Sequence, residues 1–120
     1  MMRETTWVEE VQDWNEIRDN LRYTSSLEYA MLDEELNEYM DAALTGDVVG
    51  QADALGDILV VAVGGLYKLC DGDKYKFDDI MLAVTTANNT KSDTKDANGK
   101  ITKPDDFVGP EETIGSILDV

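Results

Sequence analysis

The stretch Met31–Met40 reads MLDEELNEYM and places three glutamates at the spacing of one helix face. Residues three and four apart lie on the same side of a helix, so Glu34, Glu35 and Glu38 fall within an arc of about 100°. Apolar residues precede and follow them on nearly the same stripe, so we expect Glu34 and Glu38 to point toward the core. Crowded carboxylates are costly unless positive charge arrives, and a hard divalent cation is the simplest source of that charge. The alternative is a helix rich in Glu because Glu favours helices.

A second acidic pair lies on the next predicted helix, which covers about residues 50–69. Residues 58–63 are apolar on every side of this helix. Because charged residues flank that short run, it indicates a central, buried helix rather than a membrane span. Asp53 and Asp57 are four residues apart and therefore lie one above the other. The short connection before this helix makes it an antiparallel neighbour of the first acidic helix, so we expect five carboxylates to line one cavity.

The residue types that are missing narrow the chemistry. The chain has no histidine, which excludes zinc sites that need imidazole and also Ser-His and Cys-His catalysis. Oxygen ligands remain, and they suit Mg²⁺, Mn²⁺ or Ca²⁺. The single cysteine, Cys70, sits at the end of an apolar run, where a structural role is expected.

The charge balance bears on partners and location. Ten basic and 26 acidic residues give a net charge of −16, which argues against nucleic acid or an anionic membrane as a direct partner. No apolar signal-peptide region is evident near the N-terminus. We expect a cytoplasmic protein; a bacterium or a phage-infected host as its source is what the family resemblance given below implies.

The periodicity of the remaining sequence predicts one all-α domain over residues 1–120. Its helical core covers about residues 6–90, and a lysine-bearing arm covers 91–120. The predicted helices span about 6–22, 26–44, 50–69, 76–90 and 111–118. Asn98-Gly99 marks a turn within the arm. Four of the ten basic residues lie between Lys91 and Lys103, where they either keep a loop in solution or contact phosphates.

Two dipeptides each allow two interpretations. Trp14-Asn15 lies on the first predicted helix; an indole there is usually part of the core, but beside an amide it could also stack on a nucleobase. Gly64-Gly65 lowers helix stability by about 1 kcal/mol per glycine. This pair indicates close approach of another helix or of a ligand.

The acid spacing, Glu34-Glu35-x-x-Glu38 followed by Asp53-Ala-Leu-Gly-Asp57, resembles the all-α nucleoside triphosphate pyrophosphohydrolases. These include MazG-like proteins, dimeric dUTPases and phosphoribosyl-ATP pyrophosphohydrolase. The family pattern continues with E-x-x-D on the second helix. Asp57 matches the aspartate of this pattern, but the position of its glutamate, three residues earlier, is Ala54. Asp53 would have to supply the missing carboxylate from one residue before that position. The likeness extends to the segment 87–91, ANNTK, to the segment 99–104, GKITKP, and to Phe107 and Pro110.

This resemblance implies a four-helix-bundle-like all-α NTP pyrophosphatase fold with an extended C-terminal arm. It also implies hydrolysis between the α and β phosphates of a nucleoside triphosphate, in a dimer or tetramer, with two or more Mg²⁺ or Mn²⁺ ions. Glu35 and Glu38 are the expected catalytic residues. The implied metal ligands are Glu34, Glu35, Glu38, Asp53 and Asp57; the phosphate ligands are Asn88, Lys91 and Lys103; the base contacts are Trp14 and Asn15. The expected substrate is a deoxypurine nucleotide such as dGTP, with dUTP and dCTP as alternatives.

Two other interpretations belong to different functional classes. One is a noncatalytic acidic protein that mimics DNA and occupies a nucleic-acid-binding partner, which the net charge would suit. The other is an inactive family member that serves as a scaffold, which the departure at Ala54 would allow. A mimic needs acids spread over an exposed face, so the direction of the acidic side chains discriminates between these classes.

Overall fold

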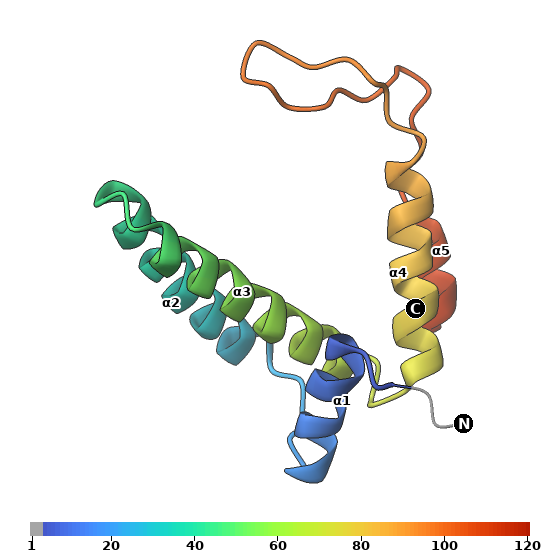
Figure 1. Cartoon of the computed structure of the whole chain (residues 1–120). Coiled ribbons are helices and arrows are strands. Elements are labelled where there is room, and N and C mark those ends of the chain that lie inside the picture. Colours follow the sequence, from blue (N-terminus) through green and yellow to red (C-terminus); the bar gives the residue numbers. More distant parts are fainter. Residues whose placement is uncertain (1–3) are drawn as a thin grey trace. The chain divides into compact units, whose positions relative to one another are not determined.

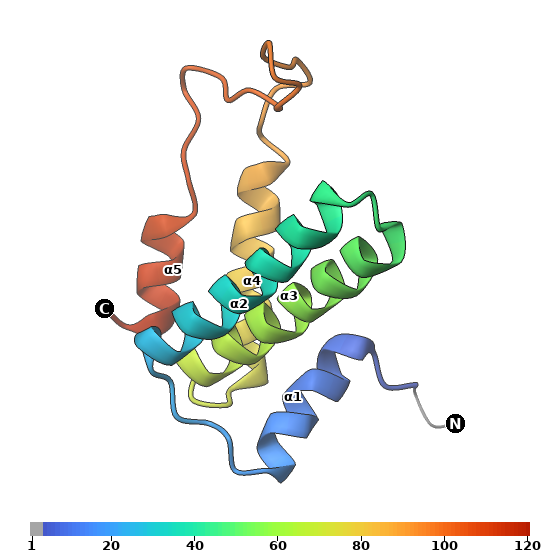
Figure 2. The same ribbon diagram turned by 90° about the vertical axis from the view of Figure 1, so that its left-hand side faces the viewer.

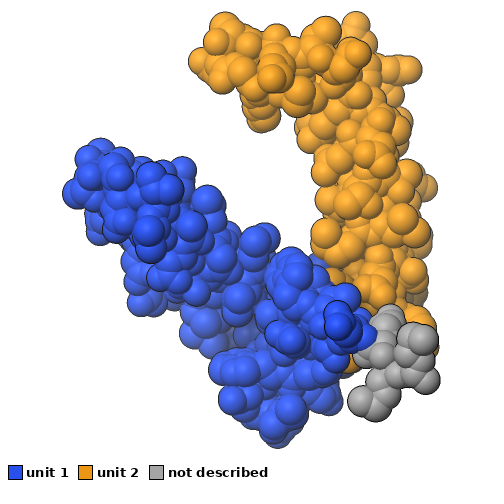
Figure 3. Space-filling model, viewed as in Figure 1, with its two compact units in different colours: residues 1–72 blue, residues 73–120 orange. Residues whose placement is uncertain are grey.

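The structure, a computed structural model, describes residues 4–120 and is all-α, as the sequence predicts (Figure 1). The described part contains five helices and no β-strand. They are α1 (Trp7–Ile17), α2 (Ser25–Leu44), α3 (Val48–Leu69), α4 (Lys74–Asn88) and α5 (Glu111–Leu118). The chain forms two compact units, residues 1–72 and 73–120, coloured separately in Figure 3. The expectation of a single domain over the whole chain stays a prediction.

Helix α1 ends earlier than the sequence predicts. The prediction of a helix to about residue 22 is wrong because the backbone reverses at Asp19, which has a left-handed φ of 49°. The amide of Asn20 donates to the carbonyl of Asn15 at 2.9 Å, and that of Asp19 donates to Glu16 at 3.1 Å. This pair of bonds is the usual way to end a helix on a left-handed residue. The apolar spacing that continues to Leu21 misled the prediction.

Helices α2 and α3 form an antiparallel hairpin and lie side by side in both views of the chain (Figures 1 and 2). Gly46 allows the tight connection, because its φ of 70° is left-handed. The side chain of Asp47 then accepts a hydrogen bond from the amide of Gly50 at 2.9 Å and caps the start of α3. The predicted antiparallel pairing is confirmed, and it places the acidic parts of both helices next to each other.

The prediction that α3 is a buried central helix is wrong, because most of its surface is exposed in a single copy of the chain. Within the first unit α3 packs against α2 and α1, and much of the rest of its surface is left uncovered. Of its most apolar 18-residue window, 17% is buried. Leu55, Leu59 and Val60 are each about half exposed. By length and composition α3 is the one helix in residues 4–120 that could cross a membrane.

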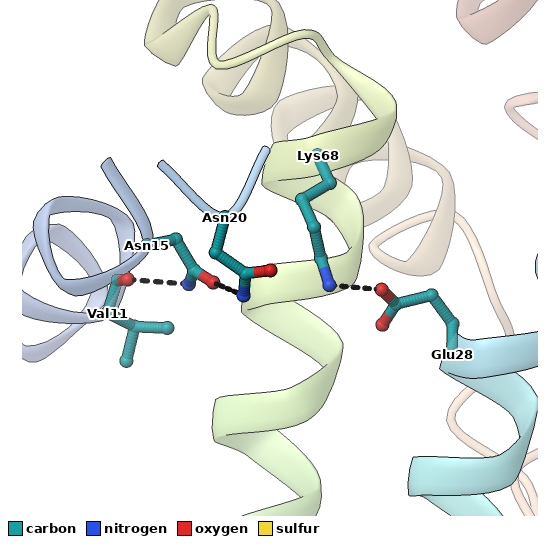
Figure 4. A network of polar contacts seen from close by, with 5 residues as sticks. All are labelled: Val11, Asn15, Asn20, Glu28 and Lys68. Carbon is teal, nitrogen blue, oxygen red and sulfur yellow. Dashed lines mark hydrogen bonds and ion pairs between the residues drawn. The ribbon is translucent and has the colours of Figure 1, made fainter. Parts of the chain in front are cut away.

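The Gly64-Gly65 pair lets polar side chains from two other helices lie against α3. A Cβ atom on Gly64 would stand 3.2 Å from the Nδ2 atom of Asn15, from α1. A Cβ atom on Gly65 would stand 2.9 Å from the Oε2 atom of Glu28, from α2. Close approach of neighbouring helices therefore accounts for both glycines. Figure 4 shows the polar side chains that gather at this level of α3.

The second unit consists of α4, the arm and α5. Asp73 caps α4 by accepting from the amides of Tyr75 and Lys76, and the buried Phe77 and Ile80 contribute to the apolar core of this unit. The arm folds back on itself through an antiparallel bridge between residues 95 and 101. Its turn contains a glycine at position 99 with a φ of 81°, as the sequence predicts. Helix α5 then packs on α4.

Candidate metal centre

Three of the five predicted metal ligands come together between α2 and α3. A carboxylate oxygen from each of Glu35, Glu38 and Asp57 lies within 4.8 Å of the other two. Glu35 and Glu38 are three residues apart on α2, and Asp57 faces them from α3. Because the helices run antiparallel, the two acidic stretches meet side by side. The result is a compact group of three oxygen donors.

Glu35 occupies the most constrained position of the three. Its Oε2 atom is buried and has no hydrogen-bond partner in the part of the chain that the structure describes. Desolvation of the carboxylate, together with the close approach of the Glu38 carboxylate and the negative charges of Asp57 and Glu34, raises the pKa of Glu35 to about 7. With this pKa, Glu35 is about half protonated at neutral pH when no cation is bound. A divalent cation removes the repulsion among all three carboxylates at once.

Glu34 and Asp53 do not belong to this compact group, and both are exposed. The charge of Glu34 still acts on Glu35. Asp53 instead lines a hollow of about 410 Å³ where α2 ends and α3 begins. Glu38 lines the same hollow, so it belongs to both places. The other acids of this hollow are Asp41 and Asp47.

The two predicted base-contacting residues differ in their surroundings. Trp14 is 51% exposed, and the guanidinium carbon of Arg18 stands 4.2 Å from its ring centroid. Asn15 is only 4% exposed. Its Nδ2 atom donates to the carbonyl of Val11 at 2.9 Å, and its Oδ1 atom accepts from Asn20 at 2.7 Å. The amide of Asn15 is therefore engaged within the first unit, as Figure 4 shows.

A hollow beside Trp14 was not anticipated. It has a volume of about 360 Å³ and lies between α1 and α3. Its lining consists of Trp7, Glu10, Val11, Trp14 and Val60. The sequence signal was the recurrence of large apolar residues along α1, which is equally typical of a helix face buried in a core. Both tryptophans are 51% exposed, so this face remains accessible.

The predicted phosphate ligands lie in the second unit. Asn88 is the last residue of α4 and is exposed. Lys91 is half-buried just after it, and Lys103 is exposed further along the arm. The ammonium group of Lys103 stands 5.1 Å from the ring centroid of Phe107. The arm thus holds one of its lysines against an aromatic ring.

Sequence reasoning missed a buried ion pair between Glu28 of α2 and Lys68 of α3, drawn in Figure 4. The relative exposure of the side chains is 8% and 3%. A signal was present in the spacing, because Glu28 precedes Glu35 by seven residues and Lys68 follows Asp57 by eleven. Those intervals are close to two and three whole helical turns. The pair therefore lies along the same stripes of α2 and α3 as the acidic cluster.

The donor set indicates which metals this site suits. Three carboxylates, without thiolate or imidazole, favour hard ions such as Mg²⁺, Mn²⁺ or Ca²⁺. Glu34 and the acids of the neighbouring hollow add negative charge nearby. No model of a known protein family matches the chain, and no curated protein sequence matches it.

Proposed function

We propose that this protein is a metal-dependent nucleoside triphosphate pyrophosphohydrolase of the MazG-like type. The observation that carries the proposal is the meeting of Glu35, Glu38 and Asp57 within 4.8 Å, from two antiparallel helices. The spacing of these acids resembles that of the all-α pyrophosphohydrolases. The buried, unpaired Oε2 atom of Glu35 supports a site built to receive a positive partner.

The proposed reaction breaks the bond between the α-phosphorus and the oxygen that bridges it to the β-phosphate. A water oxygen forms the new bond to the α-phosphorus, and pyrophosphate leaves with the bridging oxygen and its electron pair. The products are a nucleoside monophosphate and pyrophosphate. Divalent ions at this site would polarise the phosphate oxygens and lower the pKa of the attacking water.

Glu35 is the proposed general base. Its Oε2 atom has no donor within the described residues, so it can accept a hydrogen bond from the attacking water and then take its proton. Glu38 from α2 and Asp57 from α3 would hold an ion beside it. In this arrangement Glu38 and Asp57 are the main metal ligands, and one oxygen of Glu35 stays available for the attacking water.

A second ion would be held one turn further along the hairpin. Glu38 lines both the compact cluster and the hollow that contains Asp53, and a carboxylate has two oxygens with which to serve two ions. Asp53 therefore supplies the carboxylate that Ala54 lacks. Glu34 remains an outer contributor of negative charge in this proposal.

The proposed substrate carries negative charge, and so does the protein. A net charge of −16 repels a triphosphate unless local positive charge admits it. We assign this role to the bound ions together with Lys91 and Lys103, with Asn88 as a hydrogen-bonding partner of the phosphates. These residues would bind the phosphates of a substrate held either at the metal site of their own chain or at the metal site of a second copy.

Self-association is part of the same proposal. Large apolar side chains on α2 and α3 are exposed, among them Leu36, Met40, Leu55 and Leu59. Exposed apolar patches of this kind mark interaction surfaces in many proteins. A second copy would cover them and make α3 the central helix that its composition suggests. The proposed location is the cytoplasm.

The proposal is tested by pyrophosphate release from a panel of ribo- and deoxyribonucleoside triphosphates with Mg²⁺ or Mn²⁺. Glu38→Gln and Asp57→Asn are expected to lower turnover by at least about 100-fold. Asp33→Asn is the matched control, because it removes one exposed charge from α2 outside the cluster. If no nucleotide is hydrolysed, the scaffold and DNA-mimic interpretations replace the enzyme.

A further inference from the structure

The hollow between α1 and α3 has the size and lining of a small-molecule site. Its volume of about 360 Å³ lies within the range of about 300–1,000 Å³ typical of ligand pockets. Trp7, Val11 and Trp14 recur at helical spacing along one side of α1, and Val60 lines the hollow from α3. Apolar walls with one polar group are typical of sites that bind and orient a flat ring.

The tryptophans provide the stacking surface. Each is 51% exposed, although burying an indole would stabilise the fold. Arg18 stands 4.2 Å from the centroid of Trp14 and so covers one face of that ring. The other face can accept a stacked base, an interaction worth about 1–3 kcal/mol per base in other proteins.

Glu10 supplies the chemical selectivity. Its carboxylate is exposed in an otherwise apolar lining and forms no side-chain hydrogen bond or ion pair within residues 4–120. An ionised carboxylate only accepts hydrogen bonds, so a base must present donors to it. Guanine presents two adjacent donors, the ring N1–H and the exocyclic amino group, which match two carboxylate oxygens.

The other bases fit this carboxylate less well. Adenine and cytosine each place one amino group beside an unprotonated ring nitrogen, whose lone pair would face the second oxygen. Uracil and thymine present a single N–H between two carbonyl oxygens. A carboxylate flanked by indoles therefore favours guanine over every other common base.

The hollow and the acidic cluster each include one residue of α3, Val60 and Asp57 respectively. Val60 follows Asp57 by three residues, which corresponds to a rise of about 4.5 Å along the helix. We propose that Trp7, Glu10 and Trp14 form a guanine site, which makes a guanosine triphosphate the substrate. This inference rests on the proposed function and assigns its base specificity to Glu10, with Asn15 serving to shape α1.

Tryptophan fluorescence gives a direct test, because Trp7 and Trp14 are the only two tryptophans in the chain and both line the hollow. The emission of the full chain is titrated with dGMP, dIMP, dAMP, dCMP and dUMP in EDTA, so that binding does not depend on metal. The expected order places dGMP first, with dAMP at least about tenfold weaker. Inosine keeps the ring N1–H but lacks the amino group, so dIMP is expected between them.

Glu10→Gln is the deciding variant, and Glu4→Gln is its control, because Glu4 is exposed just before α1 and outside the hollow. We expect Glu10→Gln to abolish the preference for dGMP over dAMP and Glu4→Gln to retain it. Equal responses to all bases, or no response to dGMP, would overturn the guanine assignment. So would a response to tetramethylammonium, a cation that binds aromatic faces, that is stronger than the response to dGMP.

The same proteins separate this inference from the proposed function. If nucleotides are hydrolysed without a base preference and Glu10→Gln changes nothing, the guanine site is wrong and the pyrophosphohydrolase proposal stands. If dGMP binds selectively but no triphosphate is hydrolysed, the guanine site stands and the enzymatic proposal fails.

Discussion

The carboxylate of Glu28 and the ammonium group of Lys68 form an ion pair in which both side chains are almost completely removed from water. Neither oxygen of Glu28 has a hydrogen-bond partner in the described residues, so Lys68 is the group that compensates its charge. The pair joins α2 to α3 on the stripes that carry Glu35 and Asp57. It therefore helps to set the alignment of the two helices on which the acidic cluster depends.

Replacing Lys68 with Met is expected to destabilise the fold strongly. The variant leaves Glu28 buried without a partner, and breaking a buried pair in this way costs about 3–5 kcal/mol. Equilibrium unfolding in urea measures the loss. The double variant Glu28→Leu with Lys68→Met removes both charges and should recover most of the stability. Equal stability of Lys68→Met and the wild type would show that the pair does not hold the helices.

Gly65→Ala is expected to destabilise the protein, although alanine normally favours a helix. The new Cβ atom would stand 2.9 Å from the Oε2 atom of Glu28, and the buried ion pair prevents that carboxylate from moving away freely. Gly56→Ala is the matched control on the same helix, because nothing lies within 4 Å of its Cβ position. The control should gain about 0.5–1 kcal/mol. If both variants gain stability, Glu28 is not fixed against α3.

The metal-free protein should lose stability as the pH rises from about 4.5 to about 7. The pKa of Glu35 is raised to about 7 from an ordinary value of 4.5, so the folded state binds more protons than the unfolded state within this window. The stabilising proton is fully present below the lower value and is lost through the upper one. Melting temperatures of wild type and Glu35→Gln across this range measure the effect. The difference should grow in favour of Glu35→Gln with rising pH; a constant difference would contradict the shifted pKa.

Manganese is expected to raise the melting temperature by several degrees at pH 8 and by less at pH 6. Ions that bind only the folded state stabilise it by mass action, and at the lower pH a proton on Glu35 competes with the ion. Differential scanning calorimetry with and without Mn²⁺ measures the shift. Asp57→Asn should reduce the shift at both pH values, whereas Asp33→Asn should retain it. An equal shift in all three proteins would indicate diffuse binding to the acidic surface.

The sequence predicted the helices well because their apolar residues recur at helical spacing. The end of α1 was the exception, since a left-handed aspartate at position 19 stops the helix while the apolar pattern continues to Leu21. The exposure of α3 was also mispredicted. Composition shows that a helix is apolar, but it does not show whether the surface that covers it belongs to the same chain.

The candidate site was predictable only in part for a geometric reason. Glu34, Glu35 and Glu38 spread over about 100° of α2, so they cannot all face one neighbouring helix closely. The packing of α3 selects Glu35 and Glu38, and places Asp57 rather than Asp53 against them. The Glu28–Lys68 pair and the hollow beside Trp14 depend on how three helices pack, which helical periodicity alone does not define.

The most direct test of the metal centre is a crystal structure of the protein soaked in MnCl₂, with anomalous scattering recorded at the manganese edge. We expect a strong anomalous peak at about 2.1 Å from carboxylate oxygens of Glu35, Glu38 and Asp57, the distance typical of small hard divalent ions. No peak between α2 and α3, with these side chains turned toward solvent, would contradict the account.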